Sequence, residues 1–268
     1  MSIPAEGFPL AAAVSPRLQV VETTDSTNAD AVAAVLADDA GWPHLAALLT
    51  TDQRHGRGRL DRTWTAPPGT ALAVSVVVRA PGLPVAARGW IPLIAGAAMT
   101  RAVKKQLPDV GHAVALKWPN DVLAGGGKIC GILAEAVPNH PGAIVVGAGV
   151  NTRMSQAELP VSTAVSFATL GREVDEDRLL ADYLSALDEQ LQALIAAGGD
   201  ASASGVRAGV SDLCTTLGSD VAVSLPDGTV LEGRAERIDE SGRLVVVAGG
   251  AEVPVAAGDV THVRPRPV

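Results

Sequence analysis

The sequence predicts an α+β protein, in which a large mixed region is followed by a small all-β module. Over residues 18–215, apolar runs of strand length alternate with segments of helical length and periodicity. Over residues 216–268, short apolar runs are separated by turns rich in Pro, Asp and Gly. Residues 1–17 contain three prolines and several alanines, so we expect an irregular lead-in there. We therefore divide the chain into these three parts.

The composition describes a folded, acidic protein. Its 268 residues suffice for one large domain, or for one medium and one small domain. Hydrophobic residues make up 47% of the chain, which is enough for a sizeable core, and the formal net charge is −8. A protein with this charge is no general binder of nucleic acid or of membrane surfaces. Any basic site on it must therefore be local.

Several features indicate a cytoplasmic protein. The two cysteines, Cys130 and Cys214, make neither a disulfide framework nor a metal cluster. The longest apolar runs fall short of the roughly 20 residues that span a bilayer, and the start lacks the basic stretch of a signal peptide. About twenty residues precede the first motif, which is too few for a helix-turn-helix unit, so we expect no DNA-reading domain.

A helix is expected soon after the first short strand, Leu18–Glu22. The segment Asp25-Ser26-Thr27-Asn28 precedes an alanine-rich run at 29–37, and a hydroxyl at Ser26 or Thr27 is a typical helix N-cap. The free N–H groups and partial positive charge of a helix N-terminus suit a polar ligand. The same side chains are therefore candidates to face one.

The stretch Gln53–Trp64 is the most distinctive part of the sequence. It lies between two expected strands, 45–51 and 71–79, and places four arginines within nine residues, interrupted by Gly56 and Gly58. Glycines allow successive N–H groups to form an anion-binding hollow, and arginine presents a planar fork to carboxylate or phosphate. We expect this loop to bind an anion and to be disordered until one arrives. An ordinary solvated basic turn is the alternative.

The rest of the mixed region adds long helices and further strands. They are expected as helices at 90–107 and 176–197 and as strands at 113–118, 129–137 and 142–150. Pro92 falls in the first turn of its helix, where proline is tolerated. Lys117–Val122 is expected as a polar turn, and 198–205 as a loop of small residues.

The C-terminal module should contain five short strands. They are expected at 221–225, 230–238, 244–247, 252–255 and 260–263. A small barrel is the natural way to close such short strands without open edges.

Several familiar site motifs are missing from the sequence. There is no Walker-type phosphate loop and no nucleophile elbow, and Gly147-Ala148-Gly149 lacks the third glycine of a dinucleotide fingerprint. The five histidines show no metal-ligand spacing. Three signals remain, namely the arginine loop, Lys117-Trp118-Pro119-Asn120-Asp121, and Gly127-Lys128 followed by Gly131. Gly131 and Gly149 lie inside expected strands, where either a close ligand approach or a bulge explains a glycine.

In this order, the motifs resemble those of the biotin–protein ligases. The matching segments are Asp25-Ser26-Thr27-Asn28, Gln53 with Gly56-Arg57-Gly58-Arg59 and Trp64, Lys117-Trp118-Pro119-Asn120-Asp121, Gly127–Glu135 and Gly147–Asn151. Five motifs in the right order and spacing are far more specific than a single pattern. The resemblance covers 25–151 by motif and extends to the C-terminal module by layout.

The resemblance implies a class II synthetase-like catalytic domain and an SH3-like C-terminal domain. It implies that biotin's carboxylate attacks the α-phosphate of ATP, giving biotinyl-5′-AMP and pyrophosphate. A lysine of a biotin carboxyl carrier protein, part of acetyl- or acyl-CoA carboxylase, then takes the biotinyl group. Mg²⁺ would be held mainly by the phosphates. The chain looks like the monofunctional type, and we expect it to be a monomer or a weak homodimer.

The residue types fit this chemistry at both ends of biotin. The neutral side chains of Ser26, Thr27, Asn28 and Gln53 offer donors and acceptors for the ureido ring. The remaining residues assigned to biotin are Arg57, Gly58, Arg59, Lys128 and Gly131.

The nucleotide and the reaction are assigned to a second, overlapping set. The residues assigned to ATP or the adenylate are Arg57, Arg59, Arg62, Trp64, Lys117, Asn120 and Asn151. Because the first step joins two anions, the main task is to stabilise negative charge at the α-phosphate, and Lys128 and Arg59 are the catalytic candidates. Asp121 is the candidate to hold or accept the proton of the carrier lysine.

The sequence also departs from the family pattern. Asp61 stands where the loop commonly carries a last glycine, which bears on how the loop closes. Cys130 stands where a small residue such as alanine is common, a conservative change in volume, and His55 takes a position that is usually small.

Two other functions compete with this interpretation. A lipoate–protein ligase would share the fold and the adenylation logic, but its ring pocket should be more apolar than the Ser26 and Gln53 set. A non-enzymatic module that binds RNA through the arginine loop is the second rival. The acidic total and the scarcity of aromatic residues argue against it.

Overall fold

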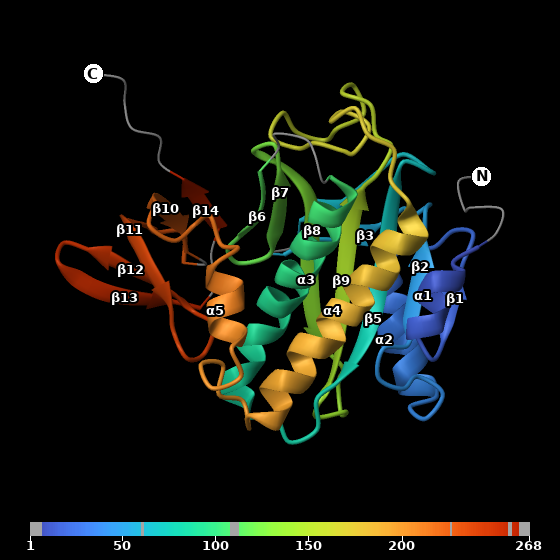
Figure 1. Cartoon of the computed structure of the whole chain (residues 1–268), viewed down its shortest axis with the longest axis horizontal. Coiled ribbons are helices and arrows are strands. Elements are labelled where there is room, and N and C mark those ends of the chain that lie inside the picture. The colour runs from blue at the N-terminus through green and yellow to red at the C-terminus, as the bar shows by residue number, and fades with distance from the viewer. Residues whose placement is uncertain (1–6, 60–61, 108–112, 226, 257–258, 263–268) are drawn as a thin grey trace.

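The computed structural model describes residues 7–59, 62–107, 113–225, 227–256 and 259–262. Its larger part is a seven-stranded sheet with helices packed on it, and its smaller part is an antiparallel module at the C-terminus (Figure 1). The expected α+β class is therefore confirmed.

The large sheet is mixed. Its strand order is β1-β2-β5-β9-β8-β7-β6, with β1 and β2 parallel and every other neighbouring pair antiparallel. The strands are β1 (Leu18–Val20), β2 (Ala47–Thr50), β5 (Ala71–Arg79), β6 (Val114–Lys117), β7 (Asp121–Ala124), β8 (Gly127–Ala136) and β9 (Ala143–Asn151). The sequence predicted a turn through Val122 and missed β7. The turn is shorter than expected, because Asp121 already pairs with Lys117.

Helices cover the two faces of this sheet unequally. α3 (Trp90–Gln106) and α4 (Glu176–Ala196) lie across one face, over the main apolar core (Figure 1). α2 (Thr27–Ala37) packs on the opposite face through Ala31 and Val35, in a separate cluster with Leu48, Val77 and Val145. Side chains alternate across a strand, so each central strand sends one set into the main core and the other set to the face that α2 covers at one end.

Two short helices were not predicted. α1 (Pro9–Val14) replaces part of the lead-in expected to be irregular, and α5 (Val206–Ser211) follows the small-residue loop. α1 is held by tertiary contacts, since the backbone N–H groups of Leu10 and Ala11 donate to the Asp177 carboxylate at 2.9 and 2.8 Å. A six-residue helix is not stable alone, which is why local sequence did not reveal it.

The C-terminal module is a five-stranded antiparallel sheet of order β13-β12-β11-β10-β14. Its strands are β10 (Asp220–Ser224), β11 (Val230–Ile238), β12 (Leu244–Ala248), β13 (Ala251–Val255) and β14 (Asp259–His262). The all-β prediction is confirmed. Its closure into an SH3-like barrel and the boundary at residue 216 stay predictions.

Two buried tryptophans join the module to the rest of the protein. Trp90 Nε1 donates to the carbonyl of Glu240 at 2.8 Å, and Trp118 Nε1 donates to that of Gly242 at 3.2 Å. Both carbonyls belong to the turn between β11 and β12. The module therefore sits against the Lys117–Asp121 turn, one of the predicted site segments.

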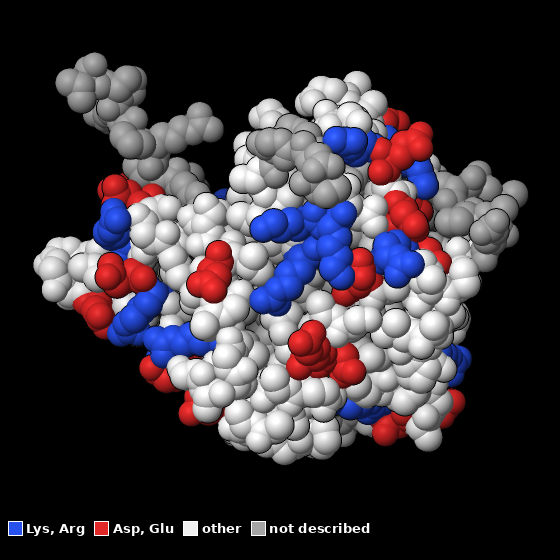
Figure 2. Space-filling view, in the orientation of Figure 1, with Lys and Arg blue, Asp and Glu red and all other residues white. Residues whose placement is uncertain are grey.

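The charges of the helical face are mixed. Figure 2 shows basic side chains near the centre of this face with acidic side chains around them, and large neutral areas between. No helix among the described residues is long and apolar enough to cross a membrane.

Candidate functional site

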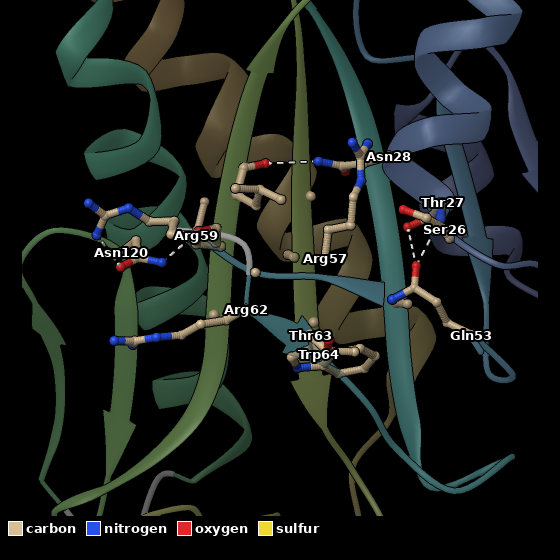
Figure 3. Close-up of a pocket in the computed structure, with 18 of the residues that line it drawn as sticks. Ser26, Thr27, Asn28, Gln53, Arg57, Arg59, Arg62, Thr63, Trp64 and Asn120 are labelled. Atoms are coloured by element: carbon tan, nitrogen blue, oxygen red, sulfur yellow. Dashed lines mark hydrogen bonds between the residues drawn. The ribbon is translucent and has the colours of Figure 1, made fainter. Parts of the chain in front are cut away.

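A pocket opens on the sheet face opposite α3 and α4, beside the N-terminus of α2 (Figure 3). Of the predicted site residues, those that line it are Ser26, Thr27, Asn28, Gln53, Arg57, Gly58, Arg59, Arg62, Trp64, Asn120, Asp121, Lys128 and Gly131. Lys117 and Asn151 are absent from its lining. Segments separated by up to about a hundred residues in sequence thus meet in one place, because β5, β9 and β8 are neighbours in the sheet.

The start of α2 forms one end of the pocket. Ser26 is the N-cap, as predicted, and its hydroxyl accepts from the N–H of Ala29. The N–H and the hydroxyl of Thr27 both donate to Gln53 Oε1, at 2.8 and 3.0 Å. Gln53 is therefore held by the first turn of the helix, and its amide orientation is determined by two donors.

Asn28 is a linking residue. Its amide nitrogen donates to the carbonyl of Leu133 at 3.2 Å and to Glu135 Oε2 at 2.7 Å, and its amide oxygen accepts from Ser75 Oγ at 2.5 Å. Both donors and an acceptor are thus already used, so Asn28 supports this end of the pocket more than it offers free groups to a ligand. Ser75, fully buried in β5, was not predicted. The sequence feature that could have identified Ser75 is its isolated hydroxyl within the apolar run Ala71–Val78.

Glycines in β8 and β9 make room for three side chains of the pocket. A Cβ at Gly147 would lie 2.3 Å from Asn28 Oδ1, one at Gly149 would lie 2.6 Å from Trp64 Cε2, and one at Gly131 would lie 3.1 Å from Lys128 Nζ. The pairing of β8 with β9 is regular through Gly131 and Gly149. Close approach of Trp64 explains Gly149. Beside Gly131, the pairing of β8 with β7 is irregular, because the register shifts between Val122 and Leu123.

The arginine loop forms a short ladder over the sheet. β3 (Gly56–Arg57) pairs with β4 (Thr63–Trp64), and the N–H of Gly58 donates to the carbonyl of Arg62 at 2.6 Å. Leu60 and Asp61 lie outside the described residues, so the question raised by Asp61 stays open to experiment. The expectation that the loop is disordered before an anion binds also stays a prediction.

The arginines of this loop point in two directions (Figure 3). Arg57 reaches towards Asn28 and pairs with Glu135 at 3.0 Å. Arg59 and Arg62 extend the other way, and Arg59 donates to Asn120 Oδ1 at 3.1 Å. Burial lowers the pKa of Arg59 and nearby Asp121 opposes this, so a cation is held half-buried where an anion would be favoured. Arg57 was predicted to bind the nucleotide, but it lies at the end of the pocket formed by Asn28 and the start of α2.

Lys128 lies at the cationic end of the pocket. Its ammonium nitrogen is 2.6 Å from Asp121 Oδ1, because β7 and β8 are paired neighbours. Lys117, half-buried nearby, has its pKa lowered by burial and by Lys128, while Asp121 raises it. Asp121 therefore offsets two lysines and an arginine. The net excess of positive charge suits phosphate groups.

Asn151 is buried behind the pocket. Its amide nitrogen donates to the carbonyl of Val165 at 2.9 Å and to that of Lys128 at 3.4 Å. Its visible role is to fix the backbone that carries Lys128, and no direct contact of Asn151 with a nucleotide follows from this geometry. The described residues contain no cluster of three or more His, Cys, Asp or Glu side chains able to hold a metal.

The pocket thus has two ends, one with neutral hydrogen-bonding side chains and one with cationic side chains. Glycines at three positions of the sheet beneath it leave room for the side chains that line it. Such a pocket defines a class of protein that binds an elongated ligand with a polar neutral head and an anionic tail, and that stabilises negative charge at that tail. Asp121 and Lys128 lie at the cationic end of this pocket.

Comparisons with known proteins agree with this class. Residues 20–151 match the Biotin/lipoate A/B protein ligase family, and residues 216–263 match the Biotin protein ligase C terminal domain. A biotin--[acetyl-CoA-carboxylase] ligase of Mycobacterium tuberculosis is 39% identical over 92% of this chain and 90% of its own length. The enzyme of the same name from Paracoccus denitrificans is 32% identical over 87% of this chain and 96% of its own length.

Solved structures share the fold. A biotin protein ligase from Aquifex aeolicus, solved with biotin and ATP, superimposes with a TM-score of 0.74 at 20% identity, over 93% of this chain and 99% of that one. The chain belongs to the biotin/lipoate protein ligase family, and its C-terminal module is of the biotin protein ligase type.

Proposed function

We propose that this protein is an ATP-dependent biotin–protein ligase. In the first step a carboxylate oxygen of biotin bonds to the α-phosphorus of ATP, the bond from that phosphorus to the bridging oxygen breaks, and pyrophosphate leaves. In the second step the amine of a carrier lysine bonds to the biotinyl carbon, AMP leaves and the amine loses a proton. The match to two ligases that act on acetyl-CoA carboxylase supports this reaction.

The observation that carries the proposal is the division of one pocket into a neutral end and a cationic end. The ureido ring of biotin suits the end formed by Ser26, Thr27 and Gln53, which presents neutral side chains positioned by the start of α2. Its carboxylate would then point to Lys128, where Gly131 leaves room for the ammonium group. Asn28 supports the ring end through its contacts with Ser75 and with the carbonyl of Leu133.

The nucleotide would occupy the cationic end. Arg59, Arg62 and Lys128 line it, and Asn120 positions Arg59. Trp64 lies against Gly149 and offers a ring face to the adenylate. Lys117 and Asn151 would act without touching the nucleotide. Lys117 would add positive potential, and Asn151 would fix the backbone of Lys128. Mg²⁺, held mainly by the phosphates, would neutralise part of their charge.

A biotin carboxyl carrier protein is the proposed acceptor. Its lysine must lose a proton to attack, and Asp121 is the carboxylate nearest the reacting end. We also propose that the enzyme works in the cytoplasm as a monomer or weak homodimer, without DNA.

One experiment tests the proposal. The protein is incubated with ATP, Mg²⁺, biotin and a biotin carrier domain, and the carrier is weighed by mass spectrometry. We expect the mass increment of one biotinyl group, dependent on ATP. A parallel reaction with lipoate tests the other branch of the family, and pyrophosphate release with lipoate and none with biotin would reverse the substrate assignment. The match of the C-terminal module favours biotin.

A further inference from the structure

Glu135 connects the arginine loop to the first turn of α2. It lies on β8 and does not line the pocket itself. Its Oε2 atom accepts from Asn28 Nδ2 at 2.7 Å and from Arg57 Nη2 at 3.0 Å. One carboxylate oxygen therefore ties together two structures that border the neutral end of the pocket.

Both ends of this connection are fixed to further elements. The other groups of the Asn28 amide bond to Ser75 in β5 and to the carbonyl of Leu133. Arg57 belongs to β3, whose partner β4 carries Trp64 over Gly149. The ion pair between Arg57 and Glu135 therefore also restrains Trp64, which borders the pocket.

We propose that Glu135 is a positioning residue that holds the β3–β4 ladder over the bound acyl-adenylate through its ion pair with Arg57. This inference rests on the proposed function. Biotinyl-AMP is a mixed anhydride, which must be kept from water until the carrier arrives. Because Glu135 lies at the neutral end, away from Lys128 and Asp121, it controls how long the adenylate stays and not how fast it forms.

The pair can form and break reversibly. The side chain of Arg57 is 45% exposed and that of Glu135 is 28% exposed, so water can replace either partner if the β3–β4 ladder moves away from the sheet. A pair in this setting is worth little in global stability. Its effect is local, because this one contact can determine whether the two-stranded β3–β4 ladder stays packed on the sheet.

The test compares the wild type with Glu135→Gln. Glutamine keeps an oxygen that accepts from Asn28 but removes the charge that faces Arg57. The adenylate is formed from labelled biotin and ATP, and its release is followed after a chase with unlabelled biotin. We expect release to be roughly fivefold faster in the variant, as for loss of a partly exposed ion pair. The single-turnover rate of pyrophosphate release at saturating biotin and ATP should be unchanged.

Two further measurements make the assignment specific. Added salt should narrow the difference in release rate between the wild type and Glu135→Gln, because it screens the pair. Glu135→Lys should release still faster, and the double variant Arg57→Glu/Glu135→Lys should recover part of the loss. The matched control is Glu252→Gln, which removes the charge of an exposed pair with Arg237 in the C-terminal module and should change nothing.

The proposal requires both faster release from Glu135→Gln and partial recovery in the double variant, and the absence of either overturns it. Failure of the proposed function gives a different result. If the wild-type protein forms no biotinyl-AMP, that function is wrong. If the wild type forms it and Glu135→Gln retains it equally well, only the role of Glu135 is wrong.

Discussion

The ammonium nitrogen of Lys128 lies 2.6 Å from Oδ1 of Asp121, across the paired strands β8 and β7. The pair is partly exposed, with side chains 39% and 23% accessible, so the lysine can turn from the carboxylate to an incoming anion. In the proposed reaction, Asp121 would hold Lys128 ready where the carboxylate and the α-phosphate meet.

Lys128→Ala should slow adenylate formation by roughly 100-fold to 1,000-fold, because a positioned cation is lost where charge develops. The rate is measured as single-turnover pyrophosphate release. The matched control is Lys105→Ala, which removes an exposed lysine paired with Asp182 on the helical face and should have no effect. An equal rate in Lys128→Ala would remove this residue from catalysis.

Asp121→Asn separates two roles of the carboxylate. If Asp121 mainly positions Lys128, both half-reactions should slow by about tenfold, the cost of one charge-assisted contact. If it acts only as a base for the carrier lysine, adenylate formation should keep its rate and transfer alone should slow. We expect both to slow, and the two steps are timed separately with preformed adenylate.

Gly149→Ala should displace Trp64, since the new Cβ would lie 2.6 Å from the ring. A shift of this kind can reduce the reaction rate by about 100-fold while leaving the fold intact. Circular dichroism checks the fold and single-turnover kinetics check the site. Gly209→Ala in α5 is the control, because only the far end of the Arg101 side chain lies near its Cβ. Equal activity of both variants would mean that Trp64 is not needed where it lies.

Trp90→Phe should weaken the docking of the C-terminal module. The variant keeps an aromatic ring but leaves the carbonyl of Glu240 without its donor, which costs about 0.5–1.5 kcal/mol, the net worth of a typical hydrogen bond. Denaturant unfolding should show an earlier transition, with the large sheet unfolding separately if the two parts become uncoupled. A superimposable curve would show that this hydrogen bond does not hold the module.

Glu176 should make stability depend on pH. Burial raises the pKa of this carboxyl, and Arg153 only partly offsets it. Between the pKa values of the unfolded and folded states the folded protein binds more protons, so stability falls as pH rises through that window. Glu176→Gln should therefore gain thermal stability relative to the wild type at neutral pH, and the gain should shrink towards pH 4. A gap that stays constant over this range would contradict the assignment.

Local patterns in the sequence determined a large part of this protein. The cap at Ser26 and the long helices follow from short-range hydrogen bonding and periodicity, and each was found near its observed bounds. Thirteen predicted site residues line one pocket, since ordered motifs from a known family carry spatial information that single residues lack.

Only the tertiary structure decided which of these side chains are available. Asn28 and Asn151 are residues of a type that often contacts ligands, yet the side-chain amide of each donates its hydrogen bonds to other groups of the protein. Arg57 turns to Glu135 instead of joining Arg59. α1 exists because Asp177 meets its first turn in space. The physical reason is common to all: hydrogen bonds and ion pairs depend on distance and direction between segments remote in sequence, and these are set only when the strands align.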